Sequence, residues 1–435
     1  MAVSCLSLTA CGKDLYQKYK SNIEKEMRLS FDFFWEEASP LREVGSSDII
    51  EGNLPTYGLI ADRYPNTSGT ASVASVGYGL SAYVIGVEEG YITREQGAER
   101  TEKTLKTMLA LQNDSDVAHE GFFAHFINMI TGKRVNGIEI SSVDTAILLC
   151  GAVHAGEYFG GEIKELATEL YSNVNWKSIE RKKGSKTYLT MGFSGDGNYS
   201  LLGNWDWYAE QLMMYVLGAG SPNEQYRLDD KTYYDFTRNE GSYGEHKFIY
   251  SWFGSIFTYQ FSHAWIDFSG YKDKNGTDWH ENSVNASKAA YEFCRDRSHL
   301  ETFAKGGWGL TACDTPDGYS GHLGAQPRGW SADGNYSKIE ATVAPCGALG
   351  SVVFTPEESL KALEYYQSLT RLQGKYGLVD AYNLDRNWYA NDSIGIDKGI
   401  TLLMLSNFKN RGVWSTSMNN QYIQNGLKNL GFTAV

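Results

Sequence analysis

The chain has 435 residues and a formal net charge of −13, with 39 Lys and Arg against 52 Asp and Glu. A chain of this length buries about three quarters of its surface on folding, so it can build a full core without help from disulfides or metals. Its acidic balance argues against a nucleic-acid partner, because phosphates are bound by clustered cations. The 11 Trp, 29 Tyr and 19 Phe residues suit a sugar ligand, since aromatic rings stack on sugar rings and Tyr and Trp also hydrogen-bond.

The first residues resemble the end of a bacterial lipoprotein signal. In Leu6-Ser7-Leu8-Thr9-Ala10-Cys11-Gly12, Cys11 stands where such signals are cleaved and lipidated, although the basic and long apolar parts of a signal are missing. We therefore expect residues 1–13 to be a truncated signal and tether, with a lipid anchor at Cys11. This predicts an exported protein of the bacterial periplasm or outer membrane. No apolar run reaches 18 residues, so no transmembrane helix is expected.

Helical patterns recur along the rest of the chain. A capping box at Thr93–Gln96 and the sequence Thr355-Pro356-Glu357-Glu358 are strong helix starts. The predicted helices cover residues 14–37, 70–89, 93–113, 141–158, 161–174, 205–219, 281–303, 341–352, 356–371, 397–408 and 418–430.

Long connections rich in Gly and Trp separate these helices, and loops of this length are usually functional. They cover residues 114–140, 176–204, 221–260 and 304–339, with a short β-ribbon expected within 121–135. No linker divides the chain, so we expect residues 14–435 to form a single all-α domain. An α/α toroid fits this alternation, because paired helices that close into a ring leave the long loops free to build one face.

Three familiar motifs fail on inspection. His119-Glu120 and His125 are spaced too widely for a zincin. Gly77-Tyr78-Gly79 has no strand before it and lies in a helical pattern, which indicates a helix–helix contact instead of a dinucleotide site. Neither GxSxG nor GxxxxGK[ST] occurs, and the six cysteines lack zinc spacing. A Cys313–Cys346 disulfide is left open.

Carboxylates among aromatic residues are the remaining chemical signal. Glycoside hydrolysis requires an acid that protonates the leaving oxygen and a carboxylate that activates water or attacks the sugar. An apolar setting raises the pKa of a carboxyl towards neutrality, and Trp205-Asp206-Trp207-Tyr208-Ala209-Glu210 provides such a setting. We expect this segment to start a helix, with Asp206 and Glu210 on one face. Glu210 is therefore a catalytic candidate.

Two further acidic segments lie at the starts of predicted helices. Glu139 ends a loop and Asp144 lies in the first turn of the next helix, where either could be the second carboxylate or a capping acid. The segment 377–399 contains Asp380, Trp388 and Asp397, and Asp397 is the leading candidate for the base. Other loop residues are expected to contact sugar, although His125 could equally be a packed core histidine. The full set of predicted substrate contacts is Trp35, Arg63, His125, Trp205, Asp206, Trp207, Trp308, Asp317, Tyr319, Asp380 and Trp388.

At the level of motifs, the chain resembles the bacterial glucoamylase-like family that includes the endo-β-1,2-glucanases and the glycoamylase-like domain of cyclic β-1,2-glucan synthases. The matching motifs are Phe34-Trp35, Gly58–Arg63, Ser75–Leu80, Gly121–Phe126, Glu139–Thr145, Trp205–Glu210, Trp308–Ala312, Asp317–Tyr319, Ala344-Pro345, Phe354–Glu358, Gly377–Asn383 and Gly395–Asp397.

The resemblance implies an (α/α)6 toroid, no essential metal or cofactor, and inverting hydrolysis of a glucan, most simply β-1,2-linked. It marks Glu210 as the acid and Asp397 as the base, with Glu139 and Asp144 as alternatives for either role. In inverting enzymes the two carboxyls stand about 6.5–9.5 Å apart. The expected partner is a glucan, with no nucleic acid, and we expect a monomer.

Three other functions compete with this one. An α-glucan glucoamylase could use the same fold, and a non-catalytic glycan-binding lipoprotein would need the aromatic residues alone. A lyase for acidic polymers would favour a basic cleft, which an acidic chain disfavours. Whether cleavage is endo or exo, and for what chain length, stays open.

Overall fold

Helices dominate the computed structural model, which describes residues 10–39, 56–327 and 340–435. In chain order they are α1 (Ala10–Glu36), α2 (Val73–Glu88), α3 (Arg94–Gln112), α4 (Ser142–Phe159), α5 (Gly161–Ser172), α6 (Leu212–Gly220), α7 (Asp230–Asp235), α8 (Trp279–Arg295), α9 (Glu301–Ala304), α10 (Pro345–Leu349), α11 (Pro356–Ser368), α12 (Gly395–Asn410), α13 (Gly412–Ser417) and α14 (Gln421–Asn429). The predicted capping box at Thr93 and Gln96 is confirmed at the start of α3.

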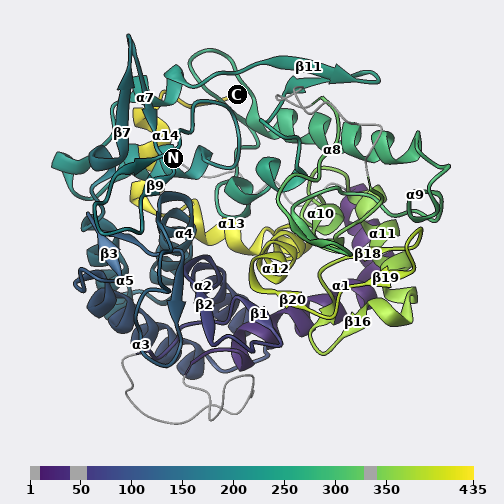
Figure 1. The fold of residues 1–435 in the computed structure, drawn as a ribbon, viewed down its shortest axis with the longest axis horizontal. Helices are drawn as coiled ribbons and strands as arrows, with labels where there is room; N and C mark the ends of the chain where they lie inside the picture. Colours follow the sequence, from purple (N-terminus) through teal and green to yellow (C-terminus); the bar gives the residue numbers. More distant parts are fainter. Residues whose placement is uncertain (1–9, 40–55, 328–339) are drawn as a thin grey trace.

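The inner helices contact one another in a closed series. Helix α2 packs on α4, α4 on α6, α10 on α12, and α12 back on α2. Between α6 and α10 the series passes through two 3-10 turns, η3 (Ile256–Tyr259) and η4 (Phe261–Ala264). There the Met213 N–H donates to the Ser262 hydroxyl at 3.0 Å, and the Gln260 amide donates to the Gly347 carbonyl at 2.8 Å. Figure 1 shows α2, α4, α10 and α12 around the centre of the molecule.

The outer helices each cover an inner element. Helix α1 packs on α2 and α12, α3 on α2, α5 on α4, α14 on α6, α8 on η3, and α11 on α10. Helices α3, α5, α8 and α11 lie towards the outside in Figure 1. The inner helices α2 and α4 are buried along almost their whole length. This explains why their sequences are apolar on every side, unlike those of amphipathic surface helices.

Glycines allow α2 and α4 to cross closely. A Cβ atom on Gly151 would lie 1.9 Å from the Gly77 carbonyl oxygen, and one on Gly77 would lie 2.4 Å from the Ile147 carbonyl oxygen. No side chain fits at either distance, so the backbones of the two helices meet directly at this crossing. The expectation that Gly77 serves a helix–helix contact is confirmed.

Short strand pairs connect the helices. The pair β1 (Arg63–Tyr64) and β20 (Ser393–Ile394) joins segments from opposite ends of the chain, with Arg63 opposite Ile394. Within 121–135, where a ribbon was expected, one isolated bridge joins Ile127 and Arg134, while β4 and β5 pair with strands outside this range. The other pairs are β2 (Thr70–Ser72) with β5 (Phe126–Asn128), β3 (Ala118–His119) with β4 (Phe122–Phe123), β6 (Ile140–Ser141) with β9 (Gly192–Phe193) and β10 (Leu201–Leu202), β7 (Glu180–Lys183) with β8 (Lys186–Leu189), β11 (Glu240–Tyr243) with β12 (His246–Ile249), β13 (Tyr271–Lys272) with β21 (Thr433–Ala434), β14 (Cys313–Thr315) with β15 (Gly318–Ser320), β16 (Gln373–Gly374) with β17 (Gly377–Leu378), and β18 (Tyr382–Asn383) with β19 (Trp388–Tyr389).

The predicted helix over 205–219 is wrong in its first part. The Thr237 N–H donates to the Asp206 carbonyl at 2.8 Å, and the Tyr208 N–H donates to the Thr237 carbonyl at 3.2 Å. Because a distant segment takes these backbone groups, the helix begins only at Leu212. Asp206 and Glu210 therefore do not share a helix face.

Two other predicted helices are shorter than expected. The range 281–303 is divided into α8 and α9, and α9 begins where the Asp385 carboxylate accepts the Glu301 N–H at 2.7 Å. The range 341–352 holds only α10, because Val343 pairs with Tyr382 and Pro345 then opens the helix. Non-local hydrogen bonds decided both boundaries.

We predict that G151A lowers the free energy of unfolding by roughly 3 kcal/mol or more, because its methyl group would push apart the two backbones where α2 and α4 cross. Chemical denaturation measures the loss. G156A, in the same helix, is the matched control: its Cβ would lie 3.0 Å from the Ala167 Cβ and 3.3 Å from the Lys164 Cα, so a shift of a few tenths of an ångström suffices and a smaller loss is expected. An equal loss in both variants would contradict the close crossing.

Candidate active site

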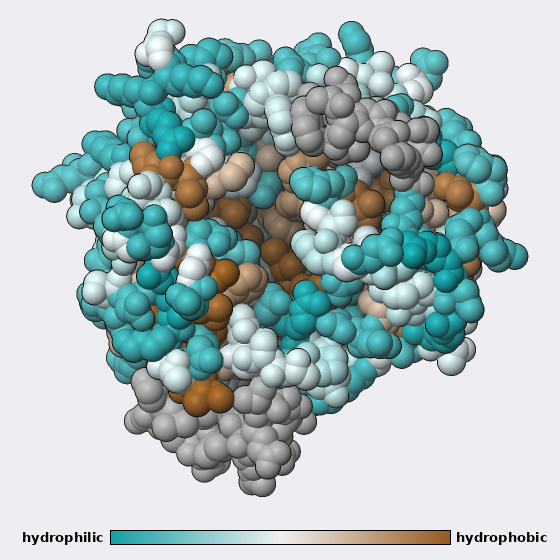
Figure 2. All heavy atoms as spheres, in the orientation of Figure 1, coloured by the Kyte–Doolittle hydropathy of each residue, from teal (hydrophilic) through white to brown (hydrophobic). Residues whose placement is uncertain are grey.

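A cavity of about 440 Å³ lies among the N-terminal ends of inner helices, within the range typical of small-molecule sites. Its walls include the apolar side chains of Phe126, Val143, Ile147, Phe257 and Phe261. In the space-filling view the face towards the viewer is hollowed at its centre, with hydrophobic residues in the hollow and mostly hydrophilic ones around it (Figure 2). The cavity thus combines ring faces with ionisable groups from distant parts of the chain.

Glu210 brings an unpaired carboxyl to this cavity. It lies in the turn just before α6, where its own carbonyl accepts the Ser262 hydroxyl at 2.6 Å. The side chain is 8% exposed, and its Oε2 atom has no hydrogen-bond partner among the described residues. Burial is the main cause that raises the pKa of Glu210 to about 7, and the charge of Asp144 adds to it. Near neutral pH, about half of the Glu210 carboxyls therefore carry a proton.

Asp397 lies in the first turn of α12 and also lines the cavity. Its carboxyl is in hydrogen-bond contact with the Asp380 carboxyl and the Cys346 thiol. Burial raises the pKa of Asp397, while these two hydrogen bonds and the Lys398 charge oppose the rise. The pKa of Asp380 lies well above its usual range because of burial and the charge of Asp397. The pair therefore favours an ionised Asp397 beside a protonated Asp380.

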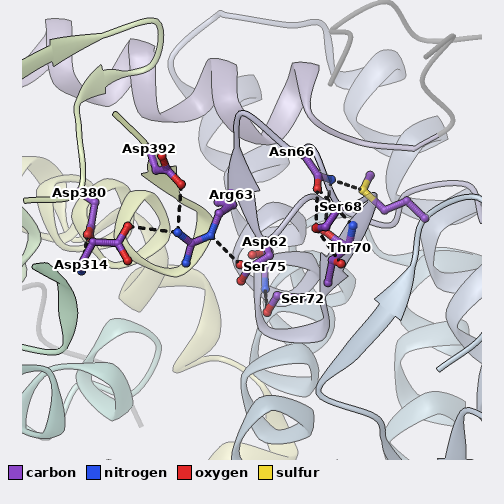
Figure 3. Close-up of polar contacts among 11 residues, drawn as sticks. Asp62, Arg63, Asn66, Ser68, Thr70, Ser72, Ser75, Asp314, Asp380 and Asp392 are labelled. Carbon is purple, nitrogen blue, oxygen red and sulfur yellow. Dashed lines mark hydrogen bonds and ion pairs between the residues drawn. The ribbon is translucent and has the colours of Figure 1, made fainter. Parts of the chain in front are cut away.

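Arg63 lies among three carboxylates at the edge of the cavity (Figure 3). Its Nη1 donates to Asp392 Oδ2 at 3.0 Å and to Asp314 Oδ2 at 3.1 Å, and its Nε donates to Asp62 Oδ2 at 3.3 Å. Burial raises the pKa of both Asp62 and Asp314, against the lowering effect of Arg63. A single guanidinium thus joins β1, β14 and the loop before β20.

His125 lies between two other acids of the site. Its Nδ1 is 2.9 Å from Glu139 Oε1, and its Nε2 is 3.7 Å from Asp144 Oδ1. Burial lowers the pKa of His125, but Asp144 and the hydrogen bond to Glu139 outweigh this effect and raise it to about 9. The same hydrogen bond lowers the pKa of Glu139. Asp144 also accepts the Ser141 hydroxyl at 2.5 Å. His125 is therefore an imidazolium at neutral pH.

The structure brings most of the predicted polar residues together. Glu210, Asp397, Asp144, Arg63, His125 and Tyr319 line the cavity. Glu139 contacts it through His125, and Asp380 lies behind Asp397.

The structure does not place most of the predicted aromatic contacts in the cavity wall. Trp308 is 1% exposed, and its indole N–H points to the Glu358 carbonyl at 3.4 Å. Trp205 donates to the Ser142 hydroxyl at 3.2 Å, and the guanidinium of Arg100 covers Trp35 at 3.6 Å. The remaining predicted contacts outside the wall are Asp206, Trp207, Asp317, which pairs with Arg386, and Trp388 on β19.

Sequence reasoning missed several functional candidates. Asp62 stands directly before Arg63, while Asp314 and Asp392 lie in the connections between helices. Phe257 and Phe261 are four residues apart, a spacing that could have marked them as neighbours. Nothing in the sequence indicates that Asp314 and Asp392 would share Arg63 with Asp62, because they lie 251 and 329 residues from Arg63 along the chain.

The cysteine question is settled by the fold. Cys313 and Cys346 are both free and buried, as are Cys150 and Cys294, so the disulfide left open by the sequence does not form. In the described ranges no cluster of three or more His, Cys, Asp or Glu is arranged to hold a metal ion. None of the described helices is both long and apolar enough to cross a membrane.

A sequence profile of the Glycoamylase family, described as "Putative glucoamylase", matches residues 203–421. The match covers half of the chain, and the chain belongs to this family. The resemblance seen in its motifs is thereby confirmed.

Individual relatives agree with this membership. An exo β-1,2-glucooligosaccharide sophorohydrolase (non-reducing end) of Parabacteroides distasonis is 29% identical over 423 residues; the match covers 87% of this chain, which spans only 56% of that protein's length. A Bacteroides uniformis structure with the same description as the family is 27% identical with a TM-score of 0.81, covering 96% of this chain and 98% of that one. An endo-β-1,2-glucanase of Chitinophaga pinensis is 24% identical with a TM-score of 0.78, covering 96% and 99%, and shows a shared fold.

The raised pKa of His125 predicts a pH-dependent contribution to stability. A pKa raised from 6.5 to about 9 contributes stability that is complete below pH 6.5 and is lost as pH rises through about 9. E139Q should lower the His125 pKa by about 1 unit, as measured by NMR of labelled histidine. E99Q, an exposed acid paired with Lys103, is the control. An unchanged His125 pKa in E139Q would contradict the ion pair.

Proposed function

We propose that the chain is a glycoside hydrolase that cleaves β-1,2-linked glucan or its oligosaccharides with inversion, using Glu210 as general acid and Asp397 as general base. Glu210 is the observation that carries the proposal. Its buried carboxyl lines the cavity, its Oε2 has no hydrogen-bond partner in the described part of the chain, and its pKa is raised to about 7. A carboxyl held in this state is suited to protonate a leaving oxygen.

The proposed reaction uses both carboxyls in one step. Glu210 donates its proton to the glycosidic oxygen while the bond to the anomeric carbon breaks. Asp397 takes a proton from a water molecule that attacks the anomeric carbon from the opposite face, so the configuration inverts. Phe126, Phe257 and Phe261 line the same cavity and offer apolar faces to the sugar rings.

Glu139 and Asp144 are better suited to positioning than to the two catalytic roles. Glu139 is engaged by His125, and Asp144 by both His125 and Ser141. A carboxylate beside an imidazolium gives up its charge less readily than an unpaired one. We therefore assign them to holding His125 and the sugar-binding wall, and keep Glu210 and Asp397 as acid and base.

The choice of β-1,2 linkage rests on the relatives. The Parabacteroides distasonis relative acts on β-1,2-glucooligosaccharides, and the Chitinophaga pinensis neighbour is an endo-β-1,2-glucanase. The family description points to glucoamylase, so starch is the competing substrate. The activities named for these two relatives favour a β-1,2 linkage over an α-linkage.

We also propose an (α/α)6 toroid for the fold, supported by the closed series of inner-helix contacts and the outer helix that covers each inner element. We further propose that the protein is an exported monomer with a lipid anchor at Cys11. Cys11 lies in the first turn of α1, and residues 1–9 of the proposed signal lie outside the described residues. Labelling with a radioactive fatty acid in a bacterial host, compared with a C11S variant, tests the anchor.

E210Q should reduce kcat on linear β-1,2-glucan by at least about 100-fold while KM changes little, because the amide keeps the shape of the carboxyl but cannot donate the proton. Sugar release from β-1,2-glucan and from starch is measured side by side, with NMR of the first product anomer. E224Q, at a glutamate that is 82% exposed, is the control. Release of sugar from starch alone would refute the proposed β-1,2 linkage. Binding without cleavage of either glucan would refute the proposal that the protein is an enzyme.

The pKa of Glu210 sets the alkaline side of the pH profile. Because Glu210 must be protonated to act as the acid, kcat/KM should fall tenfold per pH unit above about pH 7. Below that pH, Glu210 should cause no change in kcat/KM. The profile of kcat/KM on a soluble β-1,2-glucooligosaccharide measures it. A flat profile up to pH 9 would contradict the role of Glu210.

A further inference from the structure

Behind the cavity wall formed by Asp397 lies a small space lined by ionisable and apolar side chains in equal number. Its volume is about 10 Å³, at the lower limit for a single water molecule. Glu26 from α1, Asp380 and Asp397 contribute three carboxyls, and Lys398 contributes the one ammonium among the residues that line it. Glu26 is fully buried, Asp380 is 3% exposed and Lys398 is 4% exposed. Bulk water therefore has little access to Glu26, Asp380 and Lys398.

The number of charges requires one carboxyl to hold a proton. Three ionised carboxylates beside one ammonium would leave two negative charges buried without compensation, which is strongly unfavourable. Two neighbouring carboxyls that cannot both ionise share a proton, and the better-stabilised one ionises first. The question is which carboxyl keeps the proton.

The donors around Glu26 and Asp397 stabilise them in the ionised form. Lys398 Nζ donates to Glu26 Oε1 at 2.9 Å, and the Leu378 N–H donates to the same oxygen at 3.2 Å. Asp397 has the Cys346 thiol from α10 as a donor and the Lys398 charge from the next residue of α12. Glu26 and Asp397 thus share the charge of Lys398, and each accepts hydrogen bonds, although Glu26 Oε2 has no partner among the described residues.

Asp380 has much less support for a negative charge. Its Oδ2 accepts one backbone N–H, from Asp314, at 2.7 Å. The other groups whose charge acts on Asp380 are Asp397, the Asp314 carboxylate, Tyr319 and the thiols of Cys313 and Cys346. Lys398 is the one cation that lines the same space, and its ammonium donates to Glu26. Arg63 reaches it only through Asp314 (Figure 3).

We propose that Asp380 is a positioning residue that stays protonated and donates its O–H to the carboxylate of Asp397, which keeps the proposed base ionised and oriented towards the cavity. This inference rests on the proposed role of Asp397. Asp380 does not touch the sugar and gives up no proton during turnover. The proton that Asp397 takes from the attacking water returns to solvent.

Replacing Asp380 with asparagine tests whether Asp380 is protonated or ionised. In D380N the amide N–H₂ can donate to Asp397 and the amide oxygen can still accept the Asp314 N–H. We expect kcat on β-1,2-glucan to stay within about threefold of the parent, while D397N loses about 100-fold or more. A loss in D380N as large as in D397N would overturn the proposal, because it would make Asp380 an ionised catalytic group.

The acid side of the pH profile gives a second test with opposite signs. D380A removes the donor, so the pKa of Asp397 should rise and the acid limb of kcat/KM should move up by about 1 unit. If Asp380 were ionised, D380A would remove a negative charge and the limb would move down, which would refute the proposal. D380N should leave the limb in place.

An infrared measurement tests the proton without relying on activity. At about pH 9, Glu210 with its pKa near 7 is ionised, so its protonated-carboxyl band is absent. The spectrum of the parent should still show such a band, and the band should be missing in D380N. Its presence in D380N would refute the proposal. Full activity of D397N would instead refute the proposed base, and the infrared result for Asp380 would stand.

Discussion

Buried carboxyls outnumber buried cations around the cavity, and this imbalance determines the chemistry of the site. Arg63 has to compensate Asp62, Asp314 and Asp392, while Lys398 compensates Glu26 and Asp397. Removing several carboxylates from water without enough counter-charges raises the pKa of those with the least support. Glu210 and Asp380 are in that position. Burial with too few counter-charges thus raises the pKa of one carboxyl in the cavity and of another behind it.

Helix starts place the other carboxyls where they can remain ionised. Asp144 lies in the first turn of α4 and Asp397 in the first turn of α12, where the helix dipole favours negative charge. Both helices belong to the closed inner series and direct these ends to the same cavity. The pairing of β1 with β20 completes the arrangement, because it brings Arg63 beside Ile394, the residue just before α12. The site therefore depends on contact between the two ends of the chain.

Local signals predicted much of the helical framework. The capping box at Thr93 and the proline at residue 356 mark true helix starts, because a cap or a fixed φ angle acts within one turn. The predicted start of α6 at residue 205 was wrong because Thr237, about thirty residues away, pairs with Asp206 and Tyr208. Most of the predicted aromatic contacts lie outside the cavity wall for a related reason. Trp308 and Trp205 are buried in the protein interior. The number of aromatic residues in a sequence does not show whether their rings face the cavity.

The sequence by itself predicted the family, the helical class and several polar residues of the cavity, since the acids Glu210, Asp397 and Asp144 and the cation Arg63 were named from local segments and all line the cavity. Which acid holds a proton was decided only by the tertiary structure. Protonation depends on burial and on the charges within a few ångströms, and those charges come from Glu26, Lys398, Asp314 and Arg63 in distant parts of the chain. A motif names a carboxyl, but the packed fold sets its pKa.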